Sequence, residues 1–93
     1  MFSWDARKAL KNFEKHGVPF EAAATTFSDE DGLDWEVYQH QLAERRWKRL
    51  GKSSQGRVLL VVYTLRRVAN GTETNRIISA RQASRKERKA YAG

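Results

Sequence analysis

The chain has 93 residues, enough for one small domain with a single core and too few for two. It contains no cysteine, which excludes disulfides and thiolate metal sites and fits a protein of the reducing cytoplasm. The net charge of +7 is uneven, because residues 1–50 hold 8 Lys/Arg against 9 Asp/Glu while residues 51–93 hold 10 against 2. This C-terminal positive field indicates a polyanionic partner, either nucleic acid, an anionic membrane surface or an acidic protein segment.

The N-terminal part of the chain predicts one strand and two helices. Residues 2–4 favour a short strand, and Asp5 is a good N-cap for a helix that runs to about His16. The first helix carries apolar residues at helical spacing, namely Ala6, Ala9, Leu10 and Phe13. Gly17 ends this helix, and Pro19 begins a second one. The apolar face of the second helix comprises Phe20, Ala23, Ala24 and Phe27.

The rest of the chain predicts an antiparallel sheet and a last helix. Residues 28–43 are acidic and irregular, so a loop is expected there, with a possible edge strand at 33–37. Strands are predicted at residues 44–50, 57–65 and 73–80, with turns at 52–55 and at Asn70-Gly71, and a helix at 83–91. We therefore expect one α+β domain over residues 1–93, with about four antiparallel strands, two N-terminal helices and one C-terminal helix.

Five segments, in this order along nearly the whole chain, carry a family resemblance. They are FSWD at 2–5, KHGVPFEAAATTF at 15–27, ERRWKRLG at 44–51, GRVLLVVYT at 56–64 and RIISARQASRKERKAY at 76–91. Together they resemble the BrnT family, the ribonuclease toxins of bacterial and archaeal type II toxin–antitoxin pairs, which are related in fold to the RelE superfamily.

The resemblance implies a cytoplasmic endoribonuclease that cleaves RNA without a metal ion or cofactor and so arrests growth. It also implies a cognate ribbon-helix-helix antitoxin, similar to BrnA, that neutralises the toxin and joins it in a hetero-oligomer that binds operator DNA. Two other interpretations stay open from the residues alone. The chain could be an RNA- or DNA-binding module of the same fold with weak catalysis, or a scaffold whose basic half binds an antitoxin.

Arg81 is the first candidate catalytic residue. Attack of the 2'-OH of RNA on the adjacent phosphate creates extra negative charge, which the planar fork of an arginine can stabilise through two hydrogen bonds. Arg81 is expected where the last strand gives way to the last helix, a rigid place for a phosphate clamp. The alternative is that Arg81 only pairs with Glu87 or with a carboxylate of the acidic loop.

Arg46 is the second candidate clamp, and together with Trp47 it matches the family pattern. Trp47 is a candidate substrate-binding residue that could stack on a base, although a tryptophan on a strand more often belongs to the core. The cations of this strand are otherwise expected to be solvated. The sequence departs from the family at Lys48 and Arg49, where apolar residues are usual, so the strand either packs differently or presents a more basic surface.

His16 is the candidate for proton transfer, because the unperturbed pKa of histidine lies near neutrality. It stands at the C-terminus of the first predicted helix, in the family motif KHGV. A histidine in this place is more often a helix C-cap than a catalyst. His40 matches no part of the family pattern and is not a candidate.

The last predicted helix supplies further candidates. Tyr91 is expected to assist catalysis or to anchor the helix, and it shares a helix face with Glu87 four residues earlier. Glu87 is expected to orient Arg81 or Arg85 from behind. Arg76 and Arg85 are predicted to contact the substrate.

No metal site is predicted. The acidic residues 29–34 lack the spacing of a calcium loop and are expected to be a solvated loop or a screen beside the RNA groove. Trp35 and Tyr38 are candidates either for an apolar partner surface or for the core.

Overall fold

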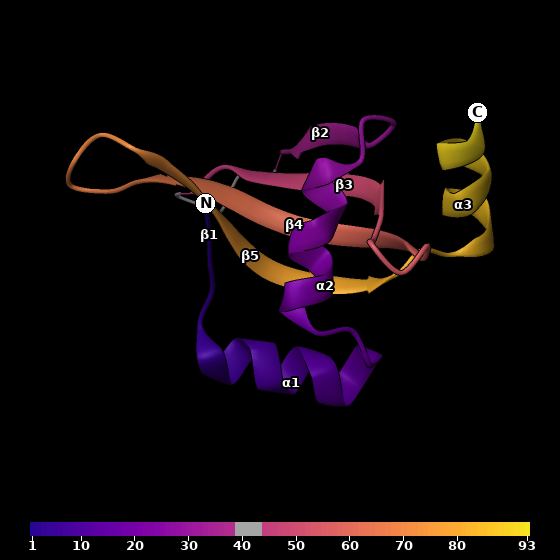
Figure 1. Cartoon of the computed structure of the whole chain (residues 1–93), viewed down its shortest axis with the longest axis horizontal. Helices are drawn as coiled ribbons and strands as arrows, with labels where there is room; N and C mark the ends of the chain where they lie inside the picture. Colours follow the sequence, from indigo (N-terminus) through magenta and orange to yellow (C-terminus); the bar gives the residue numbers. More distant parts are fainter. Residues whose placement is uncertain (39–43) are drawn as a thin grey trace.

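The computed structural model describes residues 1–38 and 44–93, which form an α+β fold (Figure 1). In chain order the elements are β1 (Phe2–Ser3), α1 (Ala6–His16), α2 (Phe20–Thr25), the 3-10 helix η1 (Thr26–Ser28), β2 (Leu33–Val37), β3 (Arg46–Lys52), β4 (Val58–Arg67), β5 (Glu73–Gln82) and α3 (Arg85–Ala92). His40 and part of the loop predicted at 28–43 lie outside the described residues. None of the described helices has the length and hydropathy of a membrane-spanning helix.

The sheet has five strands in the order β1-β5-β4-β3-β2. Strands β2 to β5 form the predicted antiparallel meander, with β4 at the centre. The described strands exceed the four expected because residues 33–37 also form an edge strand. The strand predicted at residues 2–4 forms as β1, and it pairs with β5 in parallel. Figure 1 shows α2 crossing one face of the sheet, α1 running along the β5 side, and α3 at the end of β5.

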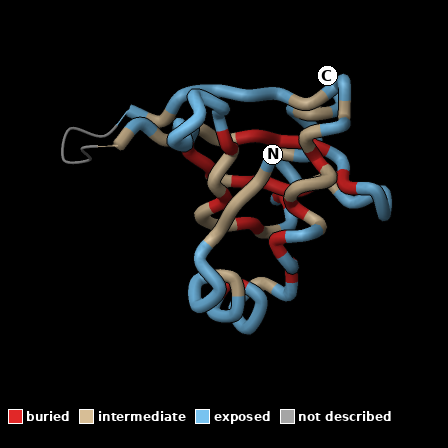
Figure 2. Tube along the Cα trace, turned by 60° about the vertical axis from the view of Figure 1, so that its left-hand side comes forward, coloured by how far each residue is buried: buried red, intermediate tan, exposed pale blue. Residues whose placement is uncertain are grey.

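Side chains alternate between the two faces of a strand, and register partners point to the same face. We call the face covered by α2 the helical face. Its core joins Val18, Phe20, Ala23, Leu59, Val61, Ile77 and Ala80. Figure 2 shows the buried segments of the chain gathered in the middle of the molecule. The burial confirms the predicted apolar faces of α2 and of the central strand.

We call the opposite face of the sheet the open face. It carries Leu33, Trp35 and Val37 of β2, Arg46, Lys48 and Leu50 of β3, Leu60, Val62 and Thr64 of β4, and Arg76, Ser79 and Arg81 of β5. Helix α3 covers one end of it, where Tyr91 packs against a small core of Leu50, Leu60 and Ala83. Lys8 of α1 borders this face beside Arg46 and Arg76.

The predicted apolar face of α1 is wrong in part. Leu10 and Phe13 are 61% and 50% exposed, and the buried residue of this helix is Asn12. The Asn12 amide donates to the carbonyls of Val18 and Ala80, at 3.2 and 2.8 Å, and its oxygen accepts the Ala80 N–H at 3.1 Å. These bonds provide partners for the N–H and carbonyl of Ala80, on an edge of β5 that β1 leaves unpaired. They also orient α1 so that Leu10 and Phe13 face solvent.

Asn12→Ala is expected to lower the free energy of unfolding by about 2 to 3 kcal/mol, because it leaves both polar groups of the Ala80 peptide buried without a partner. Urea denaturation measures the change. Lys11→Ala, at the exposed neighbouring position, is the control and should change stability by less than about 0.5 kcal/mol. Equal effects of the two substitutions would contradict the role of Asn12.

Candidate functional site

Arg81 is held on the open face by a carboxylate of α3. Its two terminal nitrogens, Nη1 and Nη2, donate to Oε1 and Oε2 of Glu87 at 2.8 and 2.9 Å. Glu87 also accepts the N–H of Ser84 in a capping box that fixes the start of α3. The Arg81 side chain is still 40% exposed, so Glu87 fixes the orientation of the guanidinium while part of it faces solvent. The pairing expected between Glu87 and Arg81 is therefore present.

The same pair sets the charge state of both groups. Hydrogen bonds from Arg81 lower the pKa of Glu87 from 4.5 to about 2, with a smaller contribution from the Ser84 backbone. The bond to Glu87 raises the pKa of Arg81. Both groups are charged at neutral pH, and Arg81 is a permanent cation.

A second cationic cluster lies further along the open face. Arg46 and Arg76 line a pocket of about 40 Å³ together with Asp5, Lys8, Glu44, Thr64, Arg66, Ile77 and Ile78. Four cations meet two carboxylates there, so the pocket carries a net positive charge. The Nε of Arg46 is buried and has no hydrogen-bond partner within the described ranges.

Trp47 does not share the face of these arginines. It pairs in register with Glu36 and Tyr63, whose ring packs edge-on against Phe27 on the helical face. The Trp47 ring lies 5.8 Å from the Arg45 guanidinium. Because neighbouring residues of a strand point to opposite faces, the structure separates Trp47 from Arg46 and Arg81.

His16 is the last residue of α1 and lies half-buried at the β5 edge of the sheet. It stands one helical turn after Asn12, on the same side of the helix, and Asn12 is bonded to Ala80, the neighbour of Arg81. The fold thus brings His16 toward the Arg81 end of β5. The other predicted contact residue, Arg85, is exposed in the first turn of α3.

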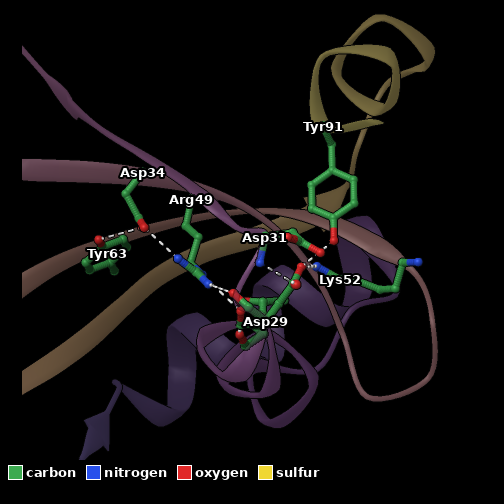
Figure 3. A network of polar contacts seen from close by, with 9 residues as sticks. Asp29, Asp31, Asp34, Arg49, Lys52, Tyr63 and Tyr91 are labelled. Atoms are coloured by element: carbon green, nitrogen blue, oxygen red, sulfur yellow. Dashed lines mark hydrogen bonds and ion pairs between the residues drawn. The ribbon is translucent and has the colours of Figure 1, made fainter. Parts of the chain in front are cut away.

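Tyr91 is engaged at the far end of α3. Its hydroxyl donates to Oδ2 of Asp29 at 2.5 Å, and this bond, followed by burial, raises the pKa of Tyr91 to about 12. Asp29 also accepts the backbone N–H of Lys52, at 2.7 Å. Figure 3 shows Tyr91 reaching from α3 to this carboxylate. The tyrosine therefore anchors α3 to the loop before β2.

The expectation that the acidic loop and the cations of β3 are simply solvated is wrong for Arg49, Asp29 and Asp34. Arg49 is 7% exposed, and its Nη1 donates to Oδ2 of Asp34 at 2.5 Å while its Nε donates to the Thr26 carbonyl at 2.9 Å. It also donates to the Asp29 carbonyl (Figure 3). The guanidinium lies over the Phe27 ring, 5.3 Å from its centroid. Arg49 thus occupies part of the helical-face core instead of adding to a basic surface.

Sequence reasoning missed this network. A Cβ on Gly32 would lie 2.2 Å from Nη2 of Arg49, so a larger residue there would force the guanidinium to shift. Sequence reasoning also missed Lys8 and Arg66, which join Arg46 and Arg76 around the pocket. Within the described ranges, no three His, Cys, Asp or Glu side chains are placed to hold a metal ion.

Comparisons with known proteins give one consistent result. The model of a family described as "Ribonuclease toxin, BrnT, of type II toxin-antitoxin system" matches residues 4–87. The crystal structure of the ribonuclease toxin BrnT of Brucella abortus superposes with a TM-score of 0.62, covering 91% of this chain and 99% of that chain at 24% identity. At this identity the likeness shows a shared fold. No match was found among curated protein sequences.

The Glu87 side chain should titrate far below its ordinary range. A carboxylate with a lowered folded pKa stabilises the fold above its unfolded pKa, and the contribution is lost as the pH falls from about 4.5 to about 2. Carbon-13 NMR of the Glu87 carboxyl should give a midpoint of about 2. Arg81→Met should raise this midpoint, whereas Arg67→Met, at the exposed ion pair with Glu73, should not. A midpoint near 4.5 in the unmodified protein would contradict the pair.

Proposed function

Since the chain belongs to the BrnT family of ribonuclease toxins of type II toxin–antitoxin systems, we propose that its open face binds RNA and cleaves it without a metal ion. The observation that carries this proposal is the oriented Arg81, which shares the open face with Arg46 and Arg76. Three arginines on one rigid sheet face suit a substrate that carries one negative charge per nucleotide.

The proposed reaction is attack of a ribose 2'-OH on the adjacent phosphate. Arg81, fixed by Glu87, stabilises the extra negative charge of the phosphorane. Arg46, which lies beside Arg76 further along the open face, holds a phosphate of the same RNA strand. His16 is proposed to take the proton of the 2'-OH or to give a proton to the leaving 5'-oxygen. Its position one helical turn after Asn12, which is bonded to Ala80, supports this role.

The remaining residues support binding and position. Arg76 holds a phosphate beside Arg46, and Arg85 contacts the RNA from the first turn of α3. Tyr91 is proposed to assist by anchoring α3, and hence Glu87, because its bond to Asp29 disfavours proton transfer by the hydroxyl at neutral pH. Trp47 has no part in this arrangement, since it points to the helical face.

A type II toxin acts with an antitoxin partner. We propose that this antitoxin is a ribbon-helix-helix protein that inhibits cleavage by covering the open face, in the cytoplasm where the RNA is. The positive charge around Arg46 and Arg76 suits an acidic inhibitory segment as well as it suits RNA. The resulting hetero-oligomer is proposed to bind operator DNA.

Arg81→Ala is expected to lower the rate of RNA cleavage by about 100-fold or more and to relieve growth arrest on induced expression, because it removes a donor aimed at transition-state charge. RNA affinity should change only a few-fold. Arg67→Ala is the matched control, since Arg67 is exposed and lies at the far end of β4. Cleavage and affinity that fall in proportion would contradict a catalytic role for Arg81.

Arg46→Ala and Arg76→Ala are expected to weaken RNA binding and its salt dependence together. Removing one arginine from a phosphate of the RNA should reduce the slope of log affinity against log salt by about 0.7 for a single strand. Fluorescence anisotropy of a labelled RNA oligonucleotide, titrated at several salt concentrations, measures the slope. An unchanged slope in both variants would show that the pocket holds no phosphate of the RNA.

A further inference from the structure

Trp35 is an exposed aromatic residue in the cationic part of the open face. It is 41% exposed, and it pairs in register with Lys48, which pairs in turn with Val62. The neighbouring residue Asp34 is bonded to Arg49 on the helical face, which independently fixes the indole on the opposite side. Trp35 therefore stands in the same sheet face as Arg46 and Arg81.

The other two tryptophans are placed differently. Trp4 packs edge-on against Phe20, with ring centroids 6.0 Å apart, beside the helical-face core. Trp47 lies on the helical face in register with Tyr63. Trp35 is thus the tryptophan of this chain that combines an exposed ring with the open face.

The sheet geometry brings the Trp35 ring within reach of the cations. A directly opposite pair such as Trp35 and Lys48 has Cβ atoms about 4.5 to 5.5 Å apart, and the diagonal neighbour Arg46 is about 7 to 8 Å away. Leu33, 44% exposed and two residues earlier on β2, extends the apolar edge. An aromatic ring beside cations that contact phosphates is the arrangement by which proteins bind single-stranded nucleic acid.

We propose that Trp35 is a base-binding residue of the site, stacking on a nucleobase of single-stranded RNA whose phosphates lie on Arg46 and Arg76. This inference rests on the proposed function and adds the direction of the RNA, which crosses the sheet from β2 toward Arg81 on β5. Because every base has a face on which to stack, Trp35 selects for unpaired nucleotides and not for one base. Duplex RNA, whose bases are stacked on one another, is a poor ligand for this position.

The test compares Trp35→Ala with Trp47→Ala, a matched control on the other face of the sheet. The probes are a short single-stranded oligonucleotide with 2'-deoxy sugars, which resists cleavage, and inorganic polyphosphate, which has no bases. Trp35→Ala should lose about ten-fold in oligonucleotide affinity, the loss typical of one stacked base, with an unchanged salt slope. Its polyphosphate affinity should be unchanged. Trp35→Phe should recover most of the loss, and Trp47→Ala should retain the affinity of the unmodified protein.

The outcomes separate this inference from the proposed function. RNA cleavage and full oligonucleotide affinity in Trp35→Ala would overturn the stacking role and leave Trp35 as surface for a protein partner. An equal loss for polyphosphate would also overturn it, because stacking requires a base. If the unmodified protein neither cleaves RNA nor binds the oligonucleotide at low salt, the proposed function fails together with the inference.

Discussion

The alternation of side chains along β3 is the constraint on which the rest of the structure depends. In this strand Trp47 and Arg49 point to the helical face, and Arg46 and Lys48 point to the open face. Burying the Arg49 charge would be costly, but the carboxylate of Asp34 and two backbone carbonyls surround the guanidinium. A slip of one residue would expose these partners and bury Arg46 and Lys48. The Arg49 network therefore fixes which cations of β3 lie on the open face.

The same network extends to the Arg81 end of the open face. The loop that binds Arg49 also contains Asp29, whose side chain accepts the Tyr91 hydroxyl from α3. Helix α3 is thus attached near both ends, through Tyr91 to the loop and through Glu87 to Arg81. A catalytic arginine must be held in place before the reaction, because reorganisation during the reaction would cost rate. The buried Arg49 and the exposed Arg81 belong to one connected set of contacts, although they lie on opposite faces of the sheet.

Local patterns predicted the elements of the fold well. The caps at Asp5 and Gly17, the apolar face of α2 and the central strand follow from residues close together in the sequence, and all are confirmed. The face of α1 was not predictable in this way. Its orientation depends on the bond of Asn12 to Ala80, 68 residues away, which outweighs the burial of Leu10 and Phe13.

The site was predictable only as far as residue type and family motif reach. Arg81 in the basic C-terminal half and Arg46 in the segment ERRW were indicated as candidates by their residue type and by their likeness to a toxin motif. The tryptophan that lies on the same face as these arginines is determined by the face that α2 covers. That is a property of the folded sheet and cannot be read from the motif ERRW. The motif pointed to Trp47, whereas the register places Trp35 beside the cations. Burial of Arg49 likewise requires partners on η1, β2 and the loop between them.

The central claim is that RNA lies on the open face, and the three tryptophan indoles report on it directly. Proton–nitrogen NMR of the labelled protein, titrated with an uncleavable single-stranded oligonucleotide, follows each indole N–H and the Nε–H of the arginines. We expect shifts of the Trp35 indole and of the Nε–H of Arg46, with the indoles of Trp4 and Trp47 unchanged. Shifts confined to Trp47 and to residues of α2 would place the RNA on the helical face and contradict this account.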